Sequence, residues 1–136
     1  MTLIVDSYAW IEFLSAGKHG PAVRTHLESS ELMLTPDIVL AEVARKYGRE
    51  GMESRQVEGH LRSITALSDV VGVSVAVALQ TPVADRDLRS RARSRKLGPP
   101  SFADVLILSV ARESQGRVLT ADRHFEGLPE VEWIGG

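Results

Sequence analysis

The sequence contains no cysteine, and that absence narrows the chemistry open to the protein. Disulfides, thiolate metal sites and a cysteine nucleophile are excluded, and a chain without thiols fits a reducing cytoplasm. No apolar run approaches the ~20 residues of a membrane span, and the N-terminus lacks a basic segment followed by a long apolar one. We therefore expect a cytoplasmic protein with no membrane insertion, whose chemistry depends on other side chains.

Motifs of several common enzyme classes are also missing. The chain has no Walker-type glycine loop, no GxGxxG fingerprint and no GxSxG motif, which argues against nucleoside-triphosphate, dinucleotide and α/β-hydrolase functions. The histidines show no HxxxH or HExxH spacing, so a zinc site of that kind is not supported. We interpret each as a surface or core residue, and they are His19, His26, His60 and His124.

What is present indicates one soluble globular domain spanning residues 1–136. The length suits a single hydrophobic core, and 43% hydrophobic with 25% charged residues is ordinary for such a domain. A net charge of −2 argues against general electrostatic attraction to nucleic acid.

The positive charge is nevertheless unevenly distributed. Residues 86–96 hold six of the sixteen lysines and arginines. On a helix, four of these would form one stripe, while Ala84, Leu88 and Ala92 would form another face. The stripe is either a phosphate-binding surface or an ordinary solvated helix face, and its members are Arg86, Arg89, Arg93 and Lys96.

The order of predicted elements indicates an α/β fold. Strands alternating with helices imply right-handed crossovers and a parallel sheet covered on both faces. Thr35-Pro36 and Thr81-Pro82 each resemble the cap and first residue of a helix. The predicted strands are 2–5, 32–35, 75–79, 117–120 and 131–134, and the predicted helices are 7–14, 20–28, 36–48, 53–67, one from Pro82 to the break at 98–100, and 101–115.

Four carboxylates stand out because of their apolar surroundings. Asp6 directly follows the first predicted strand, and Asp122 follows the fourth after one intervening residue. Ligands of parallel sheets bind outside the carboxyl ends of the strands, so both acids lie at the expected edge. Glu42 and Asp104 lie inside apolar helical segments, from which they could face the same edge.

Each acid also has a structural explanation. Asp6 could cap the helix that follows it, Glu42 could pair with Lys46, and Asp122 could form a turn with Arg123. Ser101 and Asp104 have the spacing of a capping box. Four carboxylates at one site would raise one another's pKa unless a cation neutralised them, and oxygen ligands without cysteine favour Mg²⁺ or Mn²⁺.

The four acidic segments resemble the motifs of PIN-domain ribonucleases in their order and approximate spacing. The resemblance spans nearly the whole chain, whose length is similar to that of VapC-type toxins of toxin–antitoxin pairs. The segments that carry it are "IVDSYAWIEFL" with Asp6, "VLAEVAR" with Glu42, "SFADVLILSVAR" with Asp104 and "VLTADRHF" with Asp122.

This resemblance implies a three-layer α/β/α fold with a central parallel sheet of about five strands. It also implies an endoribonuclease that uses Mg²⁺ or Mn²⁺ to cleave single-stranded regions of RNA, and further a cognate antitoxin and a homodimer. Asp6, Glu42 and Asp104 would be the core catalytic metal ligands and Asp122 the fourth, with Ser7 and Thr120 as supporting hydroxyls. Family members often carry another acid beside the fourth, whereas here Ala121 and His124 flank it.

Two alternatives remain open at this point. The same fold could be a catalytically inactive RNA- or protein-binding module, which metal-dependent cleavage would distinguish from a nuclease. A phosphoacceptor signalling domain also places acids at strand ends around Mg²⁺. The chain shows neither a second acid beside Asp6 nor an obvious lysine at the fifth strand, as that class would require.

Overall fold

A five-stranded parallel sheet forms the centre of the protein, with the strand order β3-β2-β1-β4-β5. The computed structural model describes residues 1–29 and 32–136. The expected α/β/α fold with five parallel strands is confirmed. The strands are β1 (Thr2–Val5), β2 (Leu32–Pro36), β3 (Asp69–Val71), β4 (Arg117–Thr120) and β5 (Val131–Trp133).

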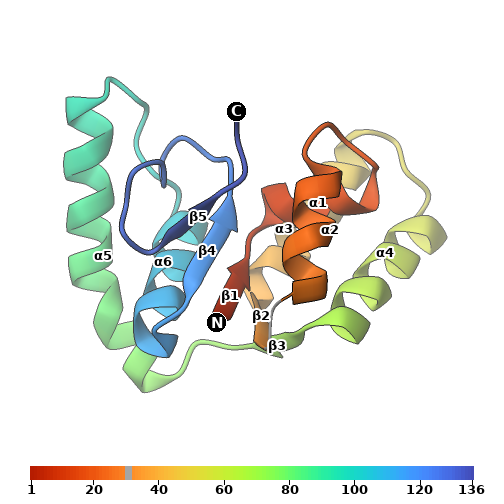
Figure 1. Ribbon diagram of the computed structural model, residues 1–136, viewed down its shortest axis with the longest axis horizontal. Coiled ribbons are helices and arrows are strands. Elements are labelled where there is room, and N and C mark those ends of the chain that lie inside the picture. The colour runs from red at the N-terminus through yellow and green to blue at the C-terminus, as the bar shows by residue number, and fades with distance from the viewer. Residues whose placement is uncertain (30–31) are drawn as a thin grey trace.

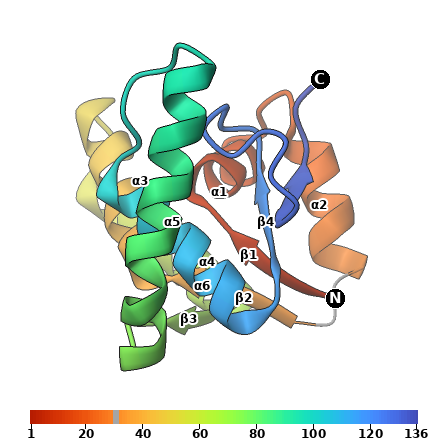
Figure 2. The same ribbon diagram turned by 90° about the vertical axis from the view of Figure 1, so that its left-hand side faces the viewer.

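Helices cover both faces of this sheet. The helices α5 and α6 lie on one side, while α1 to α4 lie on the other, with α3 behind α1 and α2 in the view and α4 at the far end (Figure 1). Figure 2 shows α5 and α6 in front of the sheet, with α6 between α5 and the strands. The helices are α1 (Ser7–Leu14), α2 (Gly20–Ser29), α3 (Asp37–Arg49), α4 (Ser54–Leu67), α5 (Val75–Ser94) and α6 (Phe102–Ser114).

The two central strands are the most deeply buried part of the sheet. Leu3, Ile4 and Val5 of β1 have no exposed surface, and neither do Val118 and Leu119 of β4. Because both faces of a doubly covered sheet are buried, such strands are apolar throughout instead of alternating. This explains why the segments 2–5 and 117–120 were predictable from sequence.

The third predicted strand is wrong. Residues 75–79 form the first turn and a half of α5, and the third strand is instead β3, Asp69–Val71. The Ser74 side chain caps the helix by accepting a hydrogen bond from the backbone N–H of Val77, at 3.1 Å. The capping serine outweighs the strand preference of the two valines, whereas an edge strand of three residues leaves almost no sequence pattern.

Pro82 lies inside α5 and does not begin it, so that helix start was also predicted wrongly. A proline at this position cannot donate the helical hydrogen bond to the carbonyl of Ala78. The hydroxyl of Thr81 donates to that carbonyl instead, at 2.7 Å. The Thr81-Pro82 pair therefore repairs an interrupted helix, although the same two residue types often start one.

We expect Pro82→Ala to stabilise the protein, because it restores a backbone hydrogen bond and removes the clash of the ring with the preceding turn. The gain should reach up to ~3 kcal/mol in the free energy of unfolding, measured by urea denaturation. As a control, Thr81→Ala should destabilise the natural sequence more than it destabilises the Pro82→Ala variant. Equal or lower stability of Pro82→Ala would contradict this account of the helix.

Thr35 does not cap α3, contrary to the sequence prediction. The helix begins at Asp37, and no side chain caps it at Pro36. The buried hydroxyl of Thr35 instead accepts a hydrogen bond from the Trp10 indole at 3.1 Å and pairs with the Ser68 hydroxyl at 2.7 Å. Thr35 therefore joins α1 to the end of α4 through β2, and it satisfies a tryptophan buried in the core.

Candidate functional site

The strand order reverses between β1 and β4, and two of the four acids lie at this point. The chain leaves β1 toward β2 and β3 on one side, and β4 continues to β5 on the other. Such a reversal leaves a crevice at the carboxyl ends of the strands. Asp6 follows β1 directly, and Asp122 follows β4 after the single residue Ala121, so both lie at the crevice.

Asp6 is almost fully buried, at 3% exposure, and two elements of the fold hold it in place. It is the N-cap of α1, and its Oδ1 accepts a hydrogen bond from the Ala9 backbone N–H at 2.8 Å. The Asp6 pKa is raised from 3.8 to about 7, chiefly by burial and also by the nearby charges of Asp122 and Glu42, whereas hydrogen bonds from Thr120 and Ala9 oppose the rise. The capping explanation for Asp6 is confirmed. The same carboxylate is also harder to ionise than a free aspartate, because its pKa is raised.

Thr120 connects the ends of the two central strands. Its buried hydroxyl hydrogen-bonds to Asp6 and also accepts a hydrogen bond from the Asp122 backbone N–H at 2.9 Å. A hydroxyl can do both because it carries one donor and two acceptor positions. This side chain therefore holds Asp6 and Asp122 in a fixed relation.

Asp104 belongs to a complete capping box at the start of α6. The Ser101 hydroxyl accepts from the Asp104 backbone N–H, and the Asp104 carboxylate accepts from the Ser101 backbone N–H, each at 3.1 Å. Burial raises the pKa of Asp104, as does the charge of Asp122, while the Ser101 hydrogen bonds and His124 lower it. The cap fixes the carboxylate at the entrance of the crevice, so the structural and functional interpretations of Asp104 are compatible.

Glu42 reaches the same place from α3. Burial raises its pKa, and so do the charges of Asp104 and Asp122, whereas a hydrogen bond from Ser7 and the charge of Arg45 lower it. Its Oε1 is buried with no hydrogen-bond partner among the described residues. The pairing of Glu42 with Lys46, the structural alternative considered from sequence, is not formed, and Lys46 Nζ lies 3.8 Å from Glu50 Oε2 instead.

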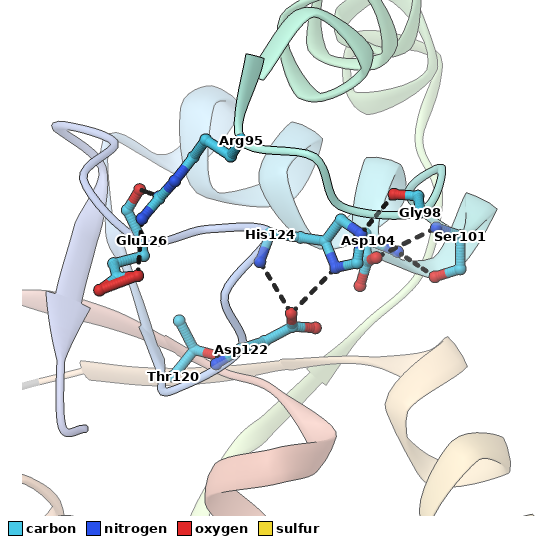
Figure 3. Close-up of polar contacts among 8 residues, drawn as sticks. All are labelled: Arg95, Gly98, Ser101, Asp104, Thr120, Asp122, His124 and Glu126. Carbon is cyan, nitrogen blue, oxygen red and sulfur yellow. Dashed lines mark hydrogen bonds and ion pairs between the residues drawn. The ribbon is translucent and has the colours of Figure 1, made fainter. Parts of the chain in front are cut away.

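Asp122 faces His124 rather than Arg123, the turn partner considered from sequence. Its Oδ1 accepts from the His124 backbone N–H at 2.9 Å and lies 3.1 Å from the imidazole Nδ1 (Figure 3). The other ring nitrogen is 2.8 Å from the Gly98 carbonyl. Burial opposes charge on this imidazole, but the hydrogen bonds to Gly98 and Asp122 and the charges of Asp122 and Asp104 raise its pKa.

The structure thus brings together all four acids predicted from sequence, from four different elements. They are coupled electrostatically, and ligand atoms of Asp104, Asp122 and His124 lie within 4.8 Å of one another. Sequence analysis placed His124 next to the site without giving it a part in it. Only its spacing of two residues from Asp122 pointed toward the cluster.

These donors fit a hard divalent cation. Carboxylate oxygens are the ligands preferred by Mg²⁺ and Mn²⁺. The pKa values of Asp6, Glu42 and Asp104 stay raised, so the positive charges of Arg45 and His124 only partly compensate the cluster. The buried Glu42 Oε1, which has no partner in the described part of the chain, is the kind of atom that a cation would satisfy.

Basic side chains of α3 border the cluster, and the sequence analysis considered only Lys46 among them, as a pairing partner of Glu42. A pocket of about 310 Å³ extends from Glu42 and Ser7 along the helix. Arg45, Lys46 and Arg49 line it at positions one and two turns beyond Glu42. The signal was present as basic residues three, four and seven positions after an acid, but only the fold shows that the acid is part of a cluster.

The basic stripe of α5 has the predicted helical geometry at Arg86, Arg89 and Arg93. Ala84, Leu88 and Ala92 are buried against the protein. The stripe itself is solvent-exposed, although Arg89 forms an ion pair with Asp85 at 3.0 Å and Lys96 lies just beyond the helix end. The four exposed stripe residues are Arg86, Arg89, Arg93 and Lys96.

None of the helices in the described residues combines the length and the hydropathy needed to cross a bilayer. No curated protein sequence matches this chain significantly.

Similarity to solved structures extends over the whole fold. A DNA-bound VapBC complex from Salmonella typhimurium contains a chain with TM-score 0.71 and 18% identity, covering 99% of both chains. A VapBC complex from Rickettsia felis bound to a promoter DNA fragment gives 0.69 and 16%, covering 98% of this chain and 97% of that one. A Mycobacterium tuberculosis VapC toxin, described as cleaving the sarcin-ricin loop, gives 0.63 and 18%, covering 96% and 98%.

At these identities the likeness concerns the fold, and the family follows from sequence. The profile of the PIN domain family matches residues 3–131, which include all four clustered acids. The strand reversal, the acids around it and this match lead to the same conclusion: the chain belongs to the PIN domain family.

Proposed function

We propose that this PIN domain is an endoribonuclease that hydrolyses phosphodiester bonds in RNA with Mg²⁺ or Mn²⁺ bound at Asp6, Glu42, Asp104 and Asp122. One observation carries the proposal: four carboxylates from four elements converge on one crevice, and three of them have pKa values raised by burial and by one another. Keeping such a cluster ionised near neutral pH requires a cation.

The protein's own residues have separable tasks in this reaction. The four carboxylates would hold the metal, while hydrogen bonds from the Thr120 and Ser7 hydroxyls orient Asp6 and Glu42. A divalent ion bound there would supply an activated water and neutralise the charge that develops on the phosphate oxygens. Arg45 and Arg49 can hold the substrate backbone close to carboxylates that would otherwise repel it.

We further propose that the protein is the toxin of a VapBC-type pair, with a cognate antitoxin as partner and a homodimer as its assembly. Support comes from the fold, which is shared with chains of VapBC complexes over nearly its full length. The acidic crevice would accept a cationic antitoxin side chain in competition with the metal, because both satisfy the same carboxylates.

The deciding experiment is cleavage of a defined panel of single-stranded and stem-loop RNAs by the purified protein in Mg²⁺, in Mn²⁺ and in EDTA. We expect cleavage in the divalent cations and none in EDTA. Folded protein that cuts no RNA in either metal would overturn the ribonuclease and favour the alternative, an inactive RNA- or protein-binding module.

Two basic surfaces are available for the RNA backbone, and their contributions can be separated. We expect Arg45→Ala with Arg49→Ala to weaken RNA binding and to reduce the slope of log Kd against log salt by about 1.4, the value for two lost phosphate contacts on a single strand. Arg89→Ala with Arg93→Ala should also flatten the slope, but less, because Arg89 is already paired with Asp85.

Fluorescence anisotropy of a labelled RNA at several salt concentrations measures both slopes. A pair whose removal leaves the slope unchanged is a solvated helix face. If that were the α3 pair, the proposed path of the RNA along α3 would be wrong.

A further inference from the structure

An exposed aromatic ring stands beside the acidic crevice without a structural task in the described residues. Phe102 is the first residue of α6, and its exposure is 69%. Phe125, Trp10 and Tyr47 are by contrast buried in the core. The backbone that carries this ring is held in place, because the capping box of Ser101 and Asp104 fixes the chain on both sides of Phe102.

Phe102 forms one wall of a pocket between α6 and α3. The pocket has a volume of about 340 Å³, and its surface is mainly apolar. Ile38, Ala41 and Arg45 line it from successive turns on one face of α3. Glu42 also lines this pocket, so it is continuous with the carboxylate cluster.

These features suit a flat, apolar group that is joined to an anionic chain. An aromatic face with an aliphatic opposite wall can hold a planar ring by stacking, and the Arg45 guanidinium can pair with a phosphate or stack on the ring's edge. Nucleobases of single strands are recognised in this way, with little dependence on sequence unless polar groups read their edges. The pocket and the adjoining arginines match a chain in which flat rings alternate regularly with phosphates. A single-stranded nucleic acid has this alternation, and a protein segment does not.

We propose that the pocket formed by Phe102, Ile38, Ala41 and Arg45 binds the base of a nucleotide adjacent to the cleaved phosphate, with Phe102 as the stacking residue. The assignment rests on the proposed function in its choice of RNA as the ligand. Phe102 is accordingly a positioning residue: it fixes where the strand lies relative to the carboxylates and touches no reacting atom.

The test compares Phe102→Ala, Phe102→Leu and Phe102→Trp, with Leu79→Ala as a control for an exposed apolar residue on α5. Stacking on an aromatic residue contributes enough to binding that we expect Phe102→Ala to raise KM by about tenfold, with kcat little changed. Phe102→Trp should keep the natural KM, and the KM of Phe102→Leu should lie between those of the natural protein and Phe102→Ala. Leu79→Ala should leave KM unchanged. An abasic nucleotide at one position beside the cleaved bond should raise the KM of the natural protein but not the KM of Phe102→Ala.

A second measurement does not depend on cleavage. Binding of RNAs carrying 2-aminopurine at successive positions is followed in EDTA, and we expect fluorescence quenching at one position that Phe102→Ala abolishes. Quenching of this kind without cleavage in any metal would leave the base pocket standing and overturn the ribonuclease. Unchanged KM, unchanged quenching and an equal abasic effect in Phe102→Ala would overturn the base pocket, and would favour a protein segment as its occupant.

Discussion

Replacing Asp104 with asparagine is expected to reduce metal-dependent RNA cleavage at least ~100-fold while the protein stays folded, because loss of a hydrogen-bond partner of a metal ligand already costs ~10–100-fold and here the ligand itself is changed. Asparagine removes the charge and one of the proposed metal ligands. Its side-chain oxygen can still accept the hydrogen bond from the Ser101 backbone N–H, so the capping box survives. Initial rates in Mg²⁺ and the circular dichroism spectrum measure the two halves of this prediction.

A variant of Ser101 separates helix capping from the proposed metal binding by Asp104. Ser101→Ala removes the capping hydroxyl and leaves the Asp104 carboxylate in place. It should lower the free energy of unfolding by about 1 kcal/mol and retain metal-dependent cleavage. If Asp104→Asn cleaves RNA as fast as the natural protein, with contaminating nuclease excluded, Asp104 is a capping residue and the assignment of the site is wrong.

Asp6→Asn is expected to abolish cleavage and at the same time to make the metal-free protein more stable at pH 8. The Asp6 pKa is raised to about 7 in the folded protein, so folding favours the neutral carboxyl. The associated stability is present below the ordinary pKa and is lost as pH rises through about 7. Asparagine is neutral at every pH and can still cap α1, and it should recover up to ~4 kcal/mol at pH 8, at about 1.4 kcal/mol for each pKa unit.

Thermal unfolding in EDTA at pH 5 and pH 8 checks this result. The natural protein should lose stability from pH 5 to pH 8 and recover it when Mg²⁺ is added. Asp6→Asn should lose less and recover less, because only Glu42 and Asp104 then keep raised pKa values. Asp69→Asn, at an exposed carboxylate at the start of β3, changes the net charge equally and should behave like the natural protein. A destabilised Asp6→Asn in EDTA at pH 8 would show that the ionised carboxylate stabilises the fold.

The sequence was sufficient for those parts of the fold in which local pattern and tertiary environment agree. The segments 2–5 and 117–120 are apolar because they are central strands, and Asp6 and Asp122 could be placed at the site because they follow such strands. Gly98 to Pro100 interrupts the chain, so the start of α6 was also predictable. All four acids came from these signals together with the family resemblance.

The remaining features depend on contacts between segments distant in sequence. β3 is an edge strand of three residues, and its pairing with β2 provides what its sequence pattern does not. His124 joins the cluster through the carbonyl of Gly98, which lies 26 residues earlier in the chain. The pocket beside Phe102 exists only because α3 and α6 meet at the mouth of the crevice.

The side chains of Asp6 and Asp104 each cap the start of a helix, and both also belong to the acidic cluster. Random mutagenesis should therefore give an asymmetric outcome at these two positions. Asparagine at either one preserves the helix start, so the products should accumulate in cells as soluble, inactive protein, whereas alanine or leucine should also reduce abundance. If the protein is a toxin, a genetic selection for survivors should then be enriched in single-base Asp-to-Asn changes that leave the amount of protein unaltered.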